Sequence, residues 1–237
     1  MTDKKKSIGN QQPLPAAVIK ETILEYLETH DVNKDNLLLK VKEKYAGENR
    51  AKKISNAIYA IITNKNALNT ALLKNFTLES FYKLSEDDKN VIAMSLICLR
   101  YPFSYNLIFS FAKLFNVQDT VNKQYITEKM ASIYGSNLSL EHGIASSLNI
   151  AVDCGFLKRE KIGLYSKIVL DAKSDFAKEA WIATFFELNG KKAVCINDLE
   201  YEPVMSYLSD LEIDWRNTKI LETMQDYSNQ IVISKLK

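Results

Sequence analysis

One stretch of this sequence, from Val91 to Ala112, is apolar except for Arg100 and a few small polar residues. Such a run must be buried, either in a bilayer or in the core of a folded domain. Pro102 breaks it into two segments of about ten residues, whereas a membrane-spanning helix needs about 20. Arg100 near a bilayer centre would cost a further ~2.5–3.5 kcal/mol. The run therefore predicts two buried helices in a soluble protein with no membrane partner.

The composition predicts a mainly α fold. Glycine and proline number only 7 and 4 in 237 residues, while Leu, Ile, Lys, Glu and Ala recur at helical spacing. This favours a helical bundle with short connections. The three cysteines, Cys98, Cys154 and Cys195, are far apart, so neither a disulfide framework nor a CxxC motif is available. Isolated thiols fit a reducing cytoplasm, and we expect a cytoplasmic protein.

The first third of the chain divides into a leader and a set of helices. Residues 1–13 are basic, then polar, and lack the apolar core of a signal peptide, so we expect a disordered leader. Residues 14–75 are expected to form an N-terminal helical domain, with one helix over 37–45 and the next over 50–63. The short turn at Gly47 between these two helices predicts a helix-turn-helix-like unit.

The rest of the chain, residues 76–237, is expected to form a C-terminal helical domain. Ser139 is predicted to N-cap an amphipathic helix that ends at Gly155. Two short strands within 156–170 then predict a β-hairpin. A helix followed by a hairpin gives this part winged-helix character. Beyond it we expect helices over 176–188, 202–208 and 217–227, and strands over 193–196 and 231–236.

Charge is distributed unevenly along the chain. Residues 1–170 carry 23 basic and 17 acidic side chains, a net charge of +6, whereas residues 171–237 carry 8 and 12, a net charge of −4. A nucleic acid, if bound, would therefore contact the first two-thirds of the chain.

The first candidate DNA-binding cluster surrounds the turn at Gly47. Lysine and arginine neutralise phosphates, and a helix N-terminus adds backbone N–H donors. Arginine and asparagine also recognise base edges. Because Glu43 and Glu48 dilute the positive charge, an ordinary solvated helix face remains an alternative. The predicted contacts are Lys40, Lys42, Lys44, Asn49, Arg50, Lys52, Lys53 and Asn56.

The second candidate cluster is on the hairpin, where Lys158, Arg159 and Lys161 could follow a phosphate backbone as a wing does. Charge on an edge strand also prevents aggregation, and that role is the alternative. The helix that precedes the hairpin has an exposed face without lysine or arginine, so we expect it to be structural.

No catalytic constellation is recognisable. The chain lacks GxGxxG, GxxxxGK[ST], HExxH and GxSxG motifs, and its two histidines, His30 and His142, are far apart. Asp198, Glu200 and Glu202 have spacings that a metal-dependent nuclease could use, but no partner motif accompanies them. We therefore expect no enzymatic activity, no catalytic residue, no cofactor and no metal site.

The order of these features resembles the BrxA family, the small helical DNA-binding component of BREX phage-defence systems. The resemblance covers about residues 35–210 as a pattern of helices and short apolar signatures. It is carried by Arg50–Lys53, Phe81–Leu84, Val91–Leu99, Leu148–Val152 and Gly155–Leu157, followed by the hairpin.

This resemblance implies a two-part helical protein that binds double-stranded DNA without catalysis, beside other bacterial defence proteins. Its DNA contact would carry over to Arg50 and Lys53. The acidic helix over 139–154 departs from that pattern and leaves the contact surface open. The alternative is a protein–protein adaptor whose acidic C-terminal part binds a basic partner. The sequence leaves the oligomeric state open.

Overall fold

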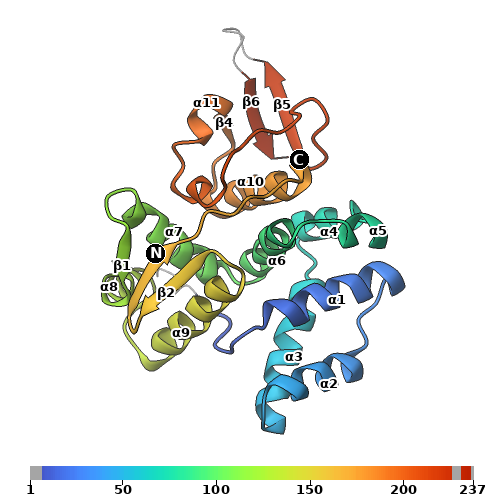
Figure 1. Cartoon of the computed structure of the whole chain (residues 1–237), viewed down its shortest axis with the longest axis vertical. Helices are drawn as coiled ribbons and strands as arrows, with labels where there is room; N and C mark the ends of the chain where they lie inside the picture. Colours follow the sequence, from blue (N-terminus) through green and yellow to red (C-terminus); the bar gives the residue numbers. More distant parts are fainter. Residues whose placement is uncertain (1–6, 226–230, 236–237) are drawn as a thin grey trace, which may run out of the picture.

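The structure is a computed structural model that describes residues 7–225 and 231–235. The chain is mainly helical, as the composition predicts, and carries small antiparallel sheets. In Figure 1 three groups of elements surround the helix α6 (Glu86–Arg100). The core runs continuously through all three groups.

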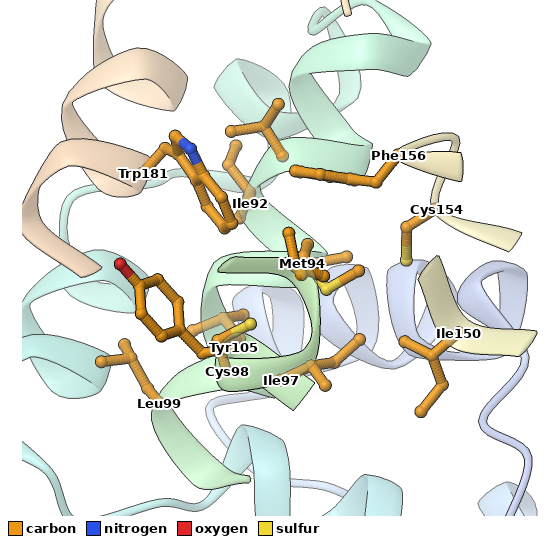
Figure 2. Close-up of a cluster of buried hydrophobic side chains, with 14 of the residues drawn as sticks. Ile92, Met94, Ile97, Cys98, Leu99, Tyr105, Ile150, Cys154, Phe156 and Trp181 are labelled. Atoms are coloured by element: carbon orange, nitrogen blue, oxygen red, sulfur yellow. The ribbon is translucent and has the colours of Figure 1, made fainter. Parts of the chain in front are cut away.

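Helix α6 is the centre of the core. Every side chain from Val91 to Leu99 is buried, which explains why this segment is almost wholly apolar. Figure 2 shows Trp181 and Phe156 beside this helix, and their ring centroids lie 5.0 Å apart. The indole Nε1–H of Trp181 donates to the carbonyl oxygen of Val204 at 3.0 Å, so the buried ring keeps a polar partner.

The next helix, α7 (Pro102–Phe115), begins at Pro102, where a missing N–H costs nothing because first-turn amides have no helical acceptor. The axes of α6 and α7 differ by 119°. Among the described residues, no single helix is long and apolar enough to cross a membrane; only this bent pair passes by length and composition.

The N-terminal group contains the two helices expected around Gly47. Asn33 N-caps the second helix by accepting from the backbone of Asp35 and Asn36. The group ends with two short helices that the sequence pattern does not predict. Its elements are α1 (Ala16–Thr29), α2 (Lys34–Lys44), α3 (Glu48–Ile62), α4 (Ala67–Lys74) and α5 (Leu78–Tyr82).

A second group runs from α7 through the predicted hairpin. The hairpin is confirmed, and a third, unanticipated strand joins it, giving an antiparallel sheet of order β1-β3-β2. Asn137, rather than Ser139, N-caps the long helix: its side chain accepts from the backbone N–H of Leu140. The elements after α7 are β1 (Thr120–Asn122), α8 (Lys123–Tyr134), α9 (Leu138–Asp153), β2 (Leu157–Lys161) and β3 (Leu164–Lys167).

The C-terminal group packs α10 against α6 and carries a second sheet of order β4-β6-β5. The helix expected over 217–227 is wrong for residues 217–225, and residues 226–227 lie outside the described residues. Residues 221–225 form a strand that pairs antiparallel with 231–235, and the backbone N–H groups of 219–221 donate to Glu179 instead of to a helical ladder. The elements are α10 (Asp175–Asn189), β4 (Ala193–Cys195), α11 (Ile196–Leu199), η1 (Pro203–Tyr207), β5 (Leu221–Gln225) and β6 (Ile231–Lys235).

The expected leader, residues 1–13, falls within the described structure only from Ser7 onward, and there the chain packs on α9. Asn10 is 8% exposed, and its Nδ2 donates to Ser146 Oγ at 3.0 Å. Ile8 lies over Gly143, where an added Cβ would come within 2.4 Å of the isoleucine Cγ2. Residues 8–14 therefore cover one face of α9 before α1 begins.

Candidate nucleic-acid interface

The turn between α2 and α3 presents the start of α3 to solvent. Gly47 is the N-cap residue, with φ of 92°, and no side chain caps the helix. The first amides of a helix have no intrahelical acceptor, so those of α3 remain donors for an anion. Asn49, Lys53 and Asn56 are exposed on the side of α3 away from its buried isoleucines. The turn thus combines backbone donors, cations and amides on one surface.

The two predicted clusters meet at a cleft of about 410 Å³. Arg50 enters it from the start of α3, and Arg159 enters it from the hairpin strand β2. The two clusters are about 110 residues apart in the sequence, and nothing in their spacing predicts that they converge. The remaining lining residues are Pro13, Leu14, Tyr45, Asn149, Val152, Asp153 and Tyr165.

The cleft is polar but only partly neutralised. The Arg50 guanidinium carbon lies 5.1 Å from the ring centroid of Tyr45, a distance at which a cation and an aromatic ring attract. Burial raises the pKa of Tyr45, the Asp153 carboxylate adds to that rise, and Arg50 opposes it. Tyr45 therefore keeps its hydroxyl proton at neutral pH.

The carboxylate in the cleft already has a structural partner. Asp153 Oδ2 accepts from the backbone N–H of Ala16 at 2.6 Å, at the first turn of α1. This bond supplies the acceptor that Pro15, the N-cap residue of α1, lacks. Asp153 forms no ion pair with Arg50 or Arg159.

Three of the predicted basic contacts are held by carboxylates. Lys40 Nζ lies 2.9 Å from Glu25, Lys52 Nζ lies 2.8 Å from Glu48, and Lys158 Nζ lies 3.2 Å from Glu160. Burial acts to raise the pKa of Glu25, but hydrogen bonds from Lys40 and the Asn33 amide outweigh it, and the pKa is lowered. The six predicted cations that are exposed and make no ion pair with a described residue are Lys42, Lys44, Arg50, Lys53, Arg159 and Lys161.

The basic residues of the hairpin lie on a strand that contains a β-bulge. Its register shifts between Arg159 and Lys161, the mark of a β-bulge. Glu160, at the bulge, accepts from Ser166 Oγ at 2.7 Å, and that bond followed by Lys158 lowers its pKa. A bulge twists a strand and redirects its side chains, so Arg159 and Lys161 need not follow the simple alternation of a flat strand.

Helix α9 contributes little positive charge to this surface. Residues 8–14 cover one of its faces, and Ser146 donates to the carbonyl oxygen of Gln12 while accepting from Asn10. Its exposed polar positions include Glu141, His142 and Asn149. Of these, only Asn149 lines the cleft. The expectation that α9 has a structural role therefore agrees with its packing.

Tyr45, Asn149 and Tyr165 line the cleft although the sequence analysis assigned them no site role. Tyr45 ends α2, Asn149 is on α9 and Tyr165 is on β3. The available sequence signal was proximity to the basic residues, since Tyr45 directly precedes the glycine turn. Nothing in the sequence spacing indicated that α9 and β3 would close the other side.

The acidic triplet considered for a nuclease does not assemble in the described part of the chain. Asp198 and Glu200 are exposed, whereas Glu202 pairs with Lys191. Within residues 7–225 and 231–235, no group of three or more His, Cys, Asp or Glu side chains is placed to hold a metal ion.

Comparisons of the chain with protein-family models, with curated proteins and with solved structures find no match.

Proposed function

We propose that this protein binds double-stranded DNA without catalysis, and that DNA phosphates lie along the cleft between α3 and the hairpin. The observation that carries the proposal is the convergence of Arg50 and Arg159, from distant parts of the sequence, on one cleft. Four further exposed lysines border the same two elements: Lys42, Lys44, Lys53 and Lys161. Such a surface fits a polyanion that is long enough to contact both elements.

The order of elements supports winged-helix character as part of this proposal. Three helices and three strands follow one another as α7-β1-α8-α9-β2-β3, with the hairpin at the end and β1 paired to β3. In such a unit the helix before the hairpin often enters the major groove. Here residues 8–14 cover part of α9, so the proposed contacts come from α3 and the hairpin instead.

We further propose, from the resemblance to BrxA proteins, that the chain is an accessory component of a bacterial, BREX-like phage-defence system. Other proteins of such a system are its proposed partners. Binding through phosphates would let the chain occupy many sequences, with modest preference among them. Purification of the protein from its native cells, with identification of what accompanies it, would test this placement.

The test of DNA binding is fluorescence anisotropy with a duplex of about 40 base pairs at several salt concentrations. Six phosphate contacts predict a slope of about −5 in a plot of log affinity against log salt, because each contact contributes about −0.9.

The R50E/K53E variant should bind all sequences at least about tenfold more weakly, with a slope about two units shallower. Exposed Lys74 and Lys192 lie outside both clusters, so K74E/K192E is a charge-matched control that should change affinity far less. Equal losses in both variants would remove α3 from the interface.

A protein–protein adaptor is the second candidate, and an acidic cleft in the C-terminal group favours it. This cleft, of about 320 Å³, is lined by Glu200, Asp210 and Glu212 together with Met205, Leu208 and Leu211. Acidic side chains around apolar ones suit a basic, amphipathic segment of a partner. Stoichiometric co-purification of such a partner, with no binding to any duplex at low salt, would favour the adaptor over the DNA-binding protein.

A further inference from the structure

The tip of the hairpin carries an apolar side chain that the phosphate contacts do not use. Ile162 is 88% exposed, the highest value among the large exposed hydrophobic residues of the described chain. Single exposed apolar residues are common on protein surfaces. Ile162 differs because it projects from a turn between two strands, directly after Lys161 and before Gly163, whose φ is +78°.

The hairpin is braced up to this tip. The carbonyl oxygen of Gly163 accepts from the backbone N–H of Lys123 at 2.7 Å, where α8 begins. Leu164 is paired with Asn122 of β1 on one side and with Lys161 of β2 on the other. The tip is therefore tied to a third strand and to a helix. An isoleucine on such a frame keeps its position when it is pressed against a ligand.

The tip lies close enough to Arg159 to reach a groove of DNA that is bound in the cleft. Ile162 follows Arg159 by three residues, which a fully extended chain would span in about 10 Å, so the bulged strand and the turn place it no farther than that from Arg159. The minor groove of DNA is about 6 Å wide. A phosphate held at Arg159 would therefore place the adjoining DNA groove close to Ile162, and exposed Lys161 directly precedes the tip.

We propose that Ile162 is a wedge that enters the minor groove of bound DNA, partly separates two stacked base pairs and kinks the duplex. Proteins that bend DNA through this groove often insert Ile, Leu, Phe, Met or Pro between base steps. This proposal rests on the proposed DNA binding and adds deformation of the DNA to it. A protein partner fits the tip less well, because the residues on either side of Ile162 are a lysine, Lys161, and a glycine, Gly163, which do not extend it into an apolar patch.

A wedge predicts a preference that depends on the flexibility of the DNA. Pyrimidine–purine steps such as TA unstack easily, whereas GC-rich segments resist deformation. The protein should therefore bind a duplex with a central TA step several-fold more tightly than a GC-rich duplex of equal length. A variant that lacks the Ile162 side chain should lose that preference but should still bind DNA through its phosphates.

The experiment uses duplexes of about 40 base pairs with a donor and an acceptor dye at their ends, and a second set with 2-aminopurine beside the central TA step. Full-length protein is compared with I162S and with V117A. Because Ile162 is exposed, I162S leaves the core intact. Val117 is 80% exposed at the other end of the sheet and serves as the aliphatic control. Anisotropy on the same samples reports binding independently of bending.

With the wedge, the wild-type protein and V117A raise energy transfer and 2-aminopurine fluorescence at saturation, whereas I162S binds but produces neither change. The inference is overturned if the wild-type protein binds without bending or unstacking the duplex, or if I162S bends it equally. Absence of any anisotropy change for the wild-type protein at low salt would instead reject the DNA-binding proposal, and the wedge with it.

Discussion

At the scale of single residues, Glu179 shows how one buried carboxylate fixes the chain around it. The side chain is 2% exposed, and its Oε1 accepts from the backbone N–H groups of Lys219, Ile220 and Leu221 at 2.7, 2.5 and 2.9 Å. Two of these three donors are on buried residues. The carboxylate therefore takes the place of a strand partner where the chain enters β5.

Replacing Glu179 separates this hydrogen bonding from the charge. E179A leaves the three amides without an acceptor, and each buried one should cost about 1–3 kcal/mol. E179Q retains an acceptor of the same shape and should change the free energy of unfolding by less than about 1 kcal/mol. Urea denaturation of the wild type and both variants at pH 7 measures this. Equal destabilisation by both substitutions would show that the charge, rather than the acceptor, holds the segment.

Glu179 also predicts a pH dependence. Burial raises its pKa above the ordinary value of 4.5, despite the three backbone hydrogen bonds that lower it. Just above that value the folded chain holds more protons than the unfolded chain, so this group lowers the free energy of unfolding as pH rises. In E179Q the side chain at this position is an uncharged amide and does not titrate. The stability of E179Q relative to wild type should therefore increase from pH 4.5 upward and then level off; a constant difference would contradict the pKa shift.

At the scale of helices and strands, the sequence predicted the elements whose apolar pattern is long and whose ends carry clear signals. The core helix ending at Arg100 and the hairpin after Gly155 are of this kind. The three-residue strand at 120–122 could not be predicted, because so short a strand has no period to detect. Residues 217–227 have a helical pattern, but residues 221–225 pair with 231–235 and the residues leading into that strand donate to Glu179, which is distant in the sequence.

The same distinction explains what was predicted of the candidate interface. Local charge identified both basic clusters, and the structure places them beside one cleft. Local sequence could not show that Glu25 pairs with Lys40, because these residues lie on different helices. Nor could it show that Asp153, at the end of α9, accepts from the Ala16 amide at the start of α1. Interfaces formed from several elements depend on such long-range contacts.

An element-scale prediction concerns Asp88, which joins α6 to the segment before α10. Its Oδ2 accepts from the Ser85 amide at 3.1 Å in a capping box, and its Oδ1 accepts from the amides of Lys173 and Ser174 at 2.8 Å each. D88A removes the carboxylate half of the capping box and leaves two further donors unpaired, so it should lower the free energy of unfolding by about 3 kcal/mol or more.

The neighbouring residue provides the control for that substitution. Asp87 Oδ2 accepts a single exposed hydrogen bond, from the amide of Asp171 at 2.8 Å. D87A should therefore cost about 1 kcal/mol or less, although it removes the same charge from the first turn of α6. Thermal and urea denaturation of D88A and D87A give the comparison. Similar losses would mean that charge at the helix N-terminus, rather than the bonds to 173–174, is what stabilises the junction.

At the scale of the whole molecule, the uneven charge bears on how DNA approaches. The proposed interface is in the part with net charge +6, and the C-terminal part, with net charge −4, repels a polyanion. Salt screens this repulsion beyond a Debye length, which is about 10 Å at 0.1 M and longer at lower salt. The acidic part should therefore slow association at low salt and orient the DNA toward the cleft, without changing the bound contacts.

Neutralising the C-terminal acids tests this orientation and separates it from the adaptor function. Glu200 and Glu212 are exposed, and neither forms an ion pair within residues 7–225 and 231–235. E200Q/E212Q should increase the association rate with duplex DNA about two- to threefold at low salt and leave the dissociation rate unchanged, because long-range charge acts on encounter. Stopped-flow anisotropy at low salt and at about 0.5 M measures both rates, and the difference should vanish at the higher salt. A lower dissociation rate in this variant would place these acids beside the bound DNA and would contradict the assignment of the interface to α3 and the hairpin. Loss of affinity for a co-purifying basic protein would instead show that the acidic cleft binds that partner.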